Sequence, residues 1–85
     1  MTAMAVNWAN FKAKRGVTPV YVQLADFIQA EIEAGRLEPG DQLPSQRDMR
    51  ELTGHSMEVA ANAMAVLRDR GLVETAIAGT FVKEP

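Results

Sequence analysis

The sequence predicts a small α+β domain in which three helices precede a C-terminal β-hairpin. The first observation is a pair of apolar stripes at helical spacing, one early and one late in the chain. The second is a serine, Ser45, placed to open a short helix between them, and the third is a pair of β-prone segments near the end. At 85 residues the chain is long enough for one small domain with a modest core.

Composition narrows the function. Hydrophobic residues make up 47% and charged residues 24%, as in an ordinary globular protein. With no cysteine and one histidine, His55, we expect no disulfide, no metal site and no cofactor. No nucleophile–base pairing and no phosphate-binding glycine loop is visible, so we expect no enzymatic activity. The apolar runs are too short for a membrane span and residues 1–18 lack the apolar centre of a signal peptide, which predicts a cytoplasmic protein.

We divide the chain into an N-terminal arm, residues 1–17, and a domain over residues 18–85. Trp8 and Phe11 lie three residues apart and could share a helical face. The basic residues of the arm form one cluster: Lys12, Lys14 and Arg15. Two interpretations stay open here. The arm is either a frayed tail with a few positive charges, or an ordered segment that docks on the domain or on a partner subunit.

The first helix is expected over residues 19–34. Thr18 is its expected cap, with Pro19 at the first helical position. Gly35 is expected to end it. Its core face consists of apolar residues that recur at steps of three and four: Tyr21, Leu24, Ala25, Ile28 and Ile32.

A turn, a short extended piece and a helix start follow within twelve residues. Pro39 and Gly40 predict a type II turn, because Pro fixes φ at its second position and Gly accepts the positive φ of its third. Residues 42–43 are expected to be extended because a residue before proline avoids the helical region. Ser45 is expected to cap the next helix by accepting from the backbone N–H of Asp48.

The second helix is expected to begin after Ser45 and to end at Gly54, with Met49 and Leu52 facing inward. The third is expected over residues 57–70, capped by Ser56. The apolar stripe of the third helix comprises Ala60, Ala63, Met64 and Leu67. Because only a short turn with a glycine separates the two helices, they form a helix-turn-helix.

The end of the chain reads as a hairpin, with strands near residues 72–75 and 80–82. Residues 42–43 could add a third short strand. This order of elements is that of a winged helix-turn-helix.

Residues 18–83 resemble the DNA-binding domain of GntR-family bacterial transcription regulators. The matching segments are Pro19-Val20-Tyr21-Val22-Gln23-Leu24-Ala25-Asp26-Phe27-Ile28, Gly35-Arg36-Leu37, Pro39-Gly40-Asp41-Gln42-Leu43-Pro44-Ser45-Gln46-Arg47, Gly71-Leu72-Val73 and Gly79-Thr80-Phe81-Val82. The resemblance implies that the third helix enters the major groove of double-stranded DNA and that the hairpin lies over the minor groove. The family's usual C-terminal effector or dimerisation domain has no counterpart in this sequence, so we expect no inducer pocket.

The resemblance also implies that Arg47 contacts DNA and that Ser56 opens the recognition helix. An arginine suits phosphate or guanine, and a capped helix start presents amides to a phosphate. The other candidate DNA contacts are Arg50, Met57, Val59, Asn62 and the arm residues Lys12, Lys14 and Arg15. Each has a plainer interpretation, such as a solvated or ion-paired arginine, a simple cap or a surface asparagine. We expect His55 to pack in the turn, and Arg68 and Arg70 to interact with the helix dipole.

Several positions depart from the family pattern. Met57 stands where an arginine is common, Ala61 where a basic residue is common, and the tip Ala76-Ile77-Ala78-Gly79 lacks basic residues and is one residue shorter. Glu58 places an acid near the helix end that would approach phosphates, which costs binding on the order of 1 kcal/mol or more. The net charge of −2 adds to this deficit.

Two functions therefore remain. The intact scaffold and Arg47 favour a small DNA-binding regulator. If its site in DNA is palindromic, the regulator would have to bind as a dimer, and the arm is the segment available for dimerisation. The missing basic residues favour a module that binds a protein partner or a second copy of itself through exposed apolar residues. The candidate interface residues of this alternative are Met57, Val59, Ala61, Val66, Ile77, Trp8 and Phe11.

Overall fold

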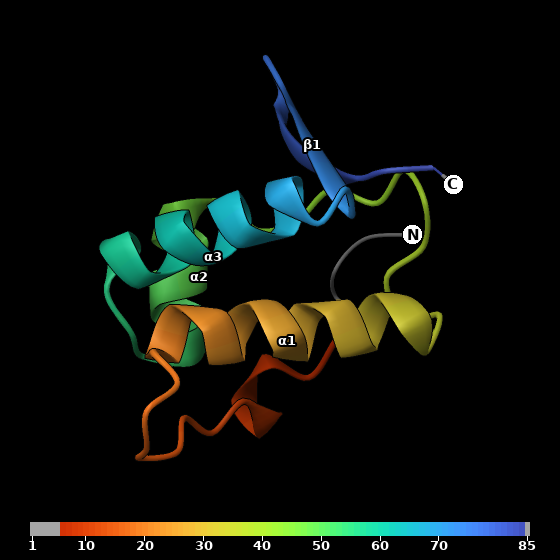
Figure 1. Ribbon diagram of the computed structural model, residues 1–85. Helices are drawn as coiled ribbons and strands as arrows, with labels where there is room; N and C mark the ends of the chain where they lie inside the picture. The colour runs from red at the N-terminus through yellow and green to blue at the C-terminus, as the bar shows by residue number, and fades with distance from the viewer. Residues whose placement is uncertain (1–5, 85) are drawn as a thin grey trace.

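The computed structural model describes residues 6–84 and shows three packed α-helices from which a β-hairpin projects (Figure 1). The elements in chain order are the 3₁₀ turn η2 (Trp8–Asn10), α1 (Val20–Glu33), α2 (Gln46–Thr53), α3 (Met57–Asp69), β1 (Val73–Ala76) and β2 (Gly79–Val82). The predicted winged helix-turn-helix is confirmed, and each predicted α-helix or strand agrees with the structure to within one or two residues. None of the helices in residues 6–84 is long and apolar enough to span a membrane.

The start of α1 differs from the prediction. Pro19 is the N-cap residue, with ψ 150°, and no side chain caps the helix, so the prediction that Thr18 would cap it was wrong. The amide of Gln23 makes the local contacts instead. Its Nε2 donates to the carbonyls of Thr18 and Lys14, both at 2.9 Å, and its Oε1 accepts from the Lys14 N–H at 2.8 Å. The side chain of Gln23, one turn into α1, thereby holds the loop that precedes the helix.

The turn before α2 forms as predicted. The Asp41 N–H donates to the Glu38 carbonyl at 2.9 Å, and Gly40 has φ +89°. The Asp41 carboxylate accepts in return from the Glu38 N–H at 2.9 Å. These two bonds cross the same turn and fix it from both sides.

The predicted third strand is a short ladder against β2. Leu43 N–H donates to the Thr80 carbonyl at 2.8 Å, and Val82 exchanges bonds with Gly40 and Asp41 at 2.9 and 2.8 Å. A single bridge, Gln42 to Phe81, joins this ladder to the hairpin, whose own register pairs Val73 with Val82. The segment that leads into α2 is therefore bonded directly to the hairpin.

Both predicted serine caps are confirmed. Ser45 Oγ accepts from the Asp48 N–H at 3.1 Å, and Ser56 Oγ accepts from the Val59 N–H at 3.2 Å. The inward position predicted for Leu52 is wrong, since its side chain is 44% exposed. The half-buried residue one turn after Met49 is Thr53, whose hydroxyl donates to the Met49 carbonyl at 2.8 Å.

The described part of the arm is ordered and docks on its own domain. Trp8 and Phe11 are buried, with ring centroids 6.0 and 5.6 Å from that of Phe27 on α1. Phe11 also meets His55 edge-on at 5.6 Å, so His55 packs in the turn as predicted. These contacts support the interpretation of the arm as an ordered segment over residues 6–11, while residues 1–5 lie outside the described part of the chain. Trp8 and Phe11 belong to the hydrophobic core of this domain, which leaves little of their side chains exposed for the interface suggested for them.

Candidate nucleic-acid interface

A shallow groove of about 440 Å³ runs between the start of α2, one side of α3 and the hairpin. Its walls come from three separate stretches of chain: residues 42–47, residues of α3 and residues 75–80. Figure 1 shows the hairpin rising from the C-terminal end of α3. The charged residues that line the groove are both arginines, Arg47 and Arg68.

Arg47 lies in the first turn of α2, immediately after the capped start. Its side chain is exposed, and the ion pairs found among residues 6–84, Arg36–Glu31 and Arg70–Asp26, do not include it. The capping residue Ser45 and the first helical residue, Gln46, line the same groove. An unneutralised guanidinium beside a helix N-terminus is a suitable arrangement for binding an anion.

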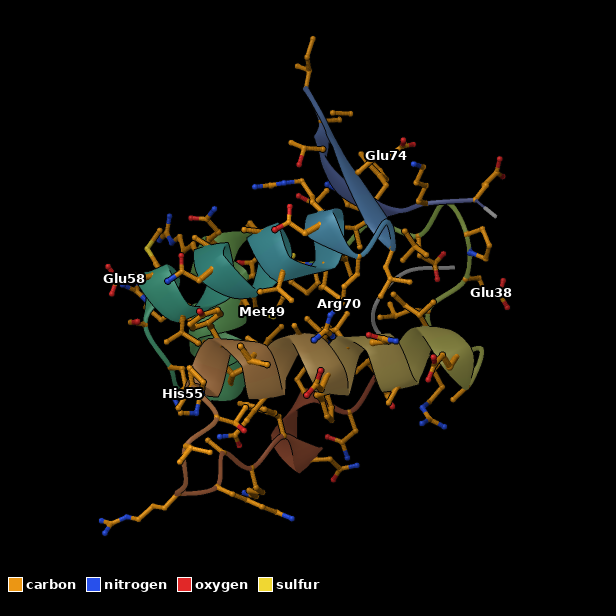
Figure 2. The ribbon with its side chains drawn as sticks, in the orientation of Figure 1. Glu38, Met49, His55, Glu58, Arg70 and Glu74 are labelled. Atoms are coloured by element: carbon orange, nitrogen blue, oxygen red, sulfur yellow. The ribbon has the colours of Figure 1, made fainter. Side chains whose placement is uncertain are left out.

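The start of α3 is exposed and carries few hydrogen-bond donors. Met57 lines the groove and is 41% exposed, and Asn62 is exposed on the same helix. Figure 2 shows Glu58 at the end of α3 farthest from the hairpin. Ser56, as the cap of α3, accepts from the Val59 N–H. These positions remain candidate DNA contacts.

The apolar set proposed for a protein interface is dispersed in the structure. Trp8 and Phe11 are buried, and Val59 and Val66 are half-buried and pack against the core. Ala61 is half-buried, while Ile77 is fully exposed at the tip of the hairpin. The well-exposed members of this set are therefore Met57 and Ile77.

The structure does not bring every basic candidate to the groove. Arg50 is exposed on α2 but does not line the groove. The arm cluster lies on the side of α1 away from α3 and the hairpin (Figure 1). Its members are Lys12, Lys14 and Arg15. The arm cluster therefore lies apart from the groove that Arg47 lines.

Arg68 is the groove residue that sequence reasoning missed. It was interpreted as a dipole partner at the end of α3, yet its Nη1 also donates to Thr75 Oγ1 on β1 at 3.1 Å. Gln42 was missed as well, and its Nε2 donates to the Ala78 carbonyl at 2.8 Å across the floor of the hairpin. Both contacts join residues that the fold brings together, so no local sequence signal announces them.

A protein-family comparison decides what this scaffold is. The family described as "Bacterial regulatory proteins, gntR family" matches residues 20–82. The chain belongs to the GntR family. It carries the winged-helix DNA-binding domain of these transcription regulators, with α3 as the helix in the recognition position.

Related GntR-family proteins share this domain. The HTH-type transcriptional regulator GgaR of Escherichia coli K12 is 38% identical over 56 residues, which cover 66% of this chain and 23% of that protein. The HTH-type transcriptional regulator Rv0792c of Mycobacterium tuberculosis H37Rv is 36% identical over 78 residues, or 91% of this chain and 29% of that protein. The chain thus spans less than a third of the length of these two relatives.

Two solved structures match most of the chain. YtrA from Sulfolobus acidocaldarius, a GntR-family transcription factor, matches with a TM-score of 0.83 and 34% identity over 88% of this chain and 81% of that one. The DNA-binding domain of AraR, solved in complex with operator ORX1, matches with a TM-score of 0.73 and 25% identity. That match covers 85% of this chain and 90% of the AraR domain.

Proposed function

We propose that this GntR-family domain binds operator DNA as a double helix, with α3 in the major groove and the hairpin over the minor groove. The observation that carries the proposal is the sign of the charge in the groove. Its charged lining residues, Arg47 and Arg68, are both cationic. The likeness to the AraR domain, which was solved on its operator, supports the same mode of docking.

The net charge of −2 does not oppose this proposal, because charge is distributed unevenly. Two of the acids, Glu31 and Asp26, are paired with Arg36 and Arg70 away from the groove. Phosphates respond most strongly to charges within about a Debye length, roughly 8–10 Å at physiological salt. A locally basic groove can therefore bind the backbone of DNA on a protein that is acidic as a whole.

A palindromic operator would seat two copies of the domain, one on each half-site. Trp8 and Phe11 are buried in their own domain, so contacts between copies would have to use other surfaces. We propose homodimer formation on DNA in this sense and assign no contact surface to it. The alternative of a protein-binding module is weakened by the dispersal of its apolar patch, which leaves Met57 and Ile77 as its well-exposed members.

The proposal is tested by fluorescence anisotropy at two salt concentrations. The protein is titrated into a labelled duplex taken from the DNA that flanks the protein's own gene. Three to five phosphate contacts per domain predict a log–log slope of about −3 to −5. Arg47→Ala should weaken binding and make the slope shallower by about one, because a groove cation is lost. Lys12→Ala, which removes the same charge behind α1, serves as the matched control. A flat salt response, or equal slopes for wild type and Arg47→Ala, would overturn DNA binding through this groove.

A further inference from the structure

We propose that Arg68 supplies the phosphate-binding cation of the hairpin, and that Thr75 positions it. This inference rests on the proposed DNA binding. It concerns a residue of α3 rather than of the hairpin, and its basis is a contact between the two. Arg68 Nη1 donates to Thr75 Oγ1 at 3.1 Å, so the guanidinium bridges from the last turn of α3 to β1.

The charge on Arg68 is not neutralised by this contact. A threonine hydroxyl is neutral, and the ion pairs found among residues 6–84 do not include Arg68. Its neighbour Arg70 provides the contrast. Arg70 Nη1 donates to Asp26 Oδ1 and to Gln29 Oε1, both at 2.8 Å, and Figure 2 shows Arg70 between α3 and α1. The two arginines at this end of α3 thus have different surroundings. Arg70 is paired with Asp26 of α1, whereas Arg68 lines the groove.

The location of Arg68 matches the path of a DNA strand. If α3 lies in the major groove and the hairpin over the minor groove, the sugar-phosphate backbone that separates the two grooves passes between α3 and the hairpin. Arg68 lines that space together with Thr75 and Thr80. A guanidinium has five N–H donors, and one bond to a hydroxyl leaves others for two oxygens of a phosphate.

The hairpin itself carries no basic side chain to do this work. Its strands and turn read Val73-Glu74-Thr75-Ala76-Ile77-Ala78-Gly79-Thr80-Phe81-Val82. Arg68, which reaches from α3 to β1, therefore places a positive charge beside a hairpin that has no basic side chain of its own. Thr75 limits the freedom of a long side chain, so less conformational entropy is lost when phosphate binds.

The test compares the salt slopes of the wild type and three variants on the same flanking duplex. Arg68→Gln is expected to weaken binding roughly five- to tenfold and to make the log–log slope shallower by about one. Arg70→Gln, the matched control two residues away, is expected to keep the wild-type slope. Arg68→Lys is expected to keep that slope while losing affinity, because charge remains and the planar fork does not. Thermal unfolding of each variant establishes that it is folded under the titration conditions.

Thr75→Val tests positioning separately. It is expected to weaken binding roughly two- to threefold with no change in slope, and to have no further effect in the Arg68→Gln background. If Thr75→Val weakens both backgrounds equally, Thr75 does not act through Arg68 and that part of the proposal fails.

Two failures are distinguishable. A wild-type slope for Arg68→Gln beside a shallower slope for Arg47→Ala overturns the role of Arg68 and leaves DNA binding in place. No salt-dependent binding by the wild-type protein overturns both. Should Arg68→Gln prove unfolded, Arg68→Lys decides, because wild-type affinity in that variant contradicts the proposal.

Discussion

Phe11 meets His55 edge-on, with their ring centroids 5.6 Å apart, and so joins the segment before α1 to the turn between α2 and α3. The two residues are separated by the whole of α1 and α2 in the chain. The same ring of Phe11 lies 5.6 Å from that of Phe27 on α1. The arm is consequently part of the support of the helix-turn-helix, and its aromatic residues stabilise the turn that places α3.

Replacing Phe11 should therefore destabilise the whole domain. Phe11→Ala is expected to lower the free energy of unfolding by about 3–5 kcal/mol, through lost burial and an unfilled cavity. Urea denaturation followed by the fluorescence of Trp8 measures the change. Val17→Ala, at a fully exposed position of the same segment, should change stability by no more than about 0.5 kcal/mol. An unaltered midpoint for Phe11→Ala would show that the arm gives the domain no support.

The ion pair between Glu31, in the last turn of α1, and Arg36 predicts a dependence of stability on pH. Arg36 Nε and Nη2 donate to the two oxygens of Glu31 at 2.8 and 2.6 Å. The hydrogen bond from Arg36 is the main cause that lowers the pKa of Glu31 below its ordinary value of 4.5, against a smaller opposing effect of burial. A carboxyl with a lowered folded-state pKa stabilises the protein fully above about its unfolded value, and this stabilisation is lost as pH falls through the folded pKa.

Glu31→Gln should accordingly reduce stability at neutral pH and remove part of the fall in stability that the wild type shows below about pH 4.5. Unfolding midpoints measured from neutral pH down to strongly acidic buffer give the comparison. Glu51→Gln, at an exposed acid on α2, is the control. Parallel pH curves for wild type and Glu31→Gln would mean that this carboxyl does not titrate abnormally.

Gly79 should tolerate no side chain. Its φ is +139°, a region that other residues rarely adopt, and an added Cβ would lie 2.5 Å from Gln42 Nε2. Gly79→Ala is expected to cost about 1–3 kcal/mol of stability from backbone strain and to displace the Gln42 amide from the Ala78 carbonyl.

Amide hydrogen exchange at Leu43, whose N–H donates to β2, would report loosening of the hairpin in Gly79→Ala. Ala78→Gly is the matched control, because Ala78 has no positive φ and its neighbour keeps its geometry. Equal exchange protection in wild type and Gly79→Ala would refute the requirement for glycine.

Met57→Arg separates DNA binding from protein binding. Met57 is exposed in the groove at a position where the GntR pattern has an arginine. A DNA-binding domain should gain affinity roughly three- to tenfold and a salt slope steeper by about one. A module that used Met57 as an apolar contact would instead lose its partner. Anisotropy with duplex DNA distinguishes these outcomes, and Leu52→Arg, at another exposed apolar position, controls for added charge alone.

Features fixed by local chemistry were predictable from the sequence. The turn at Gly40 and the caps at Ser45 and Ser56 each depend on residues within three positions of one another. The ends of the helices were predictable for the same reason, because a glycine follows each of them within two residues. At Gly35 the Arg36 N–H donates to the Glu31 carbonyl at 3.1 Å and the Gly35 N–H donates to that of Ile32. The resemblance of these segments to GntR proteins therefore identified the fold.

Features decided by tertiary packing were not predictable. Trp8 and Phe11 are too few to define a periodic face, and their burial depends on Phe27 and His55 far along the chain. Leu52 has the right spacing from Met49 but is exposed, because packing and not periodicity selects the inward side of so short a helix. In the sequence, Arg68 looks like any basic residue at a helix end. Its contact with Thr75 becomes visible only in the folded structure.

The backbone ladder between residues 40–43 and β2 has a consequence for the choice of operator. Because the hairpin is bonded to the segment that enters α2, it cannot swing on its own to follow a groove of a different width. A duplex that engages α3 and the hairpin together must supply the adjustment by bending or by changing its own twist. Sequences that deform at low cost would then be selected even at base pairs that no side chain touches.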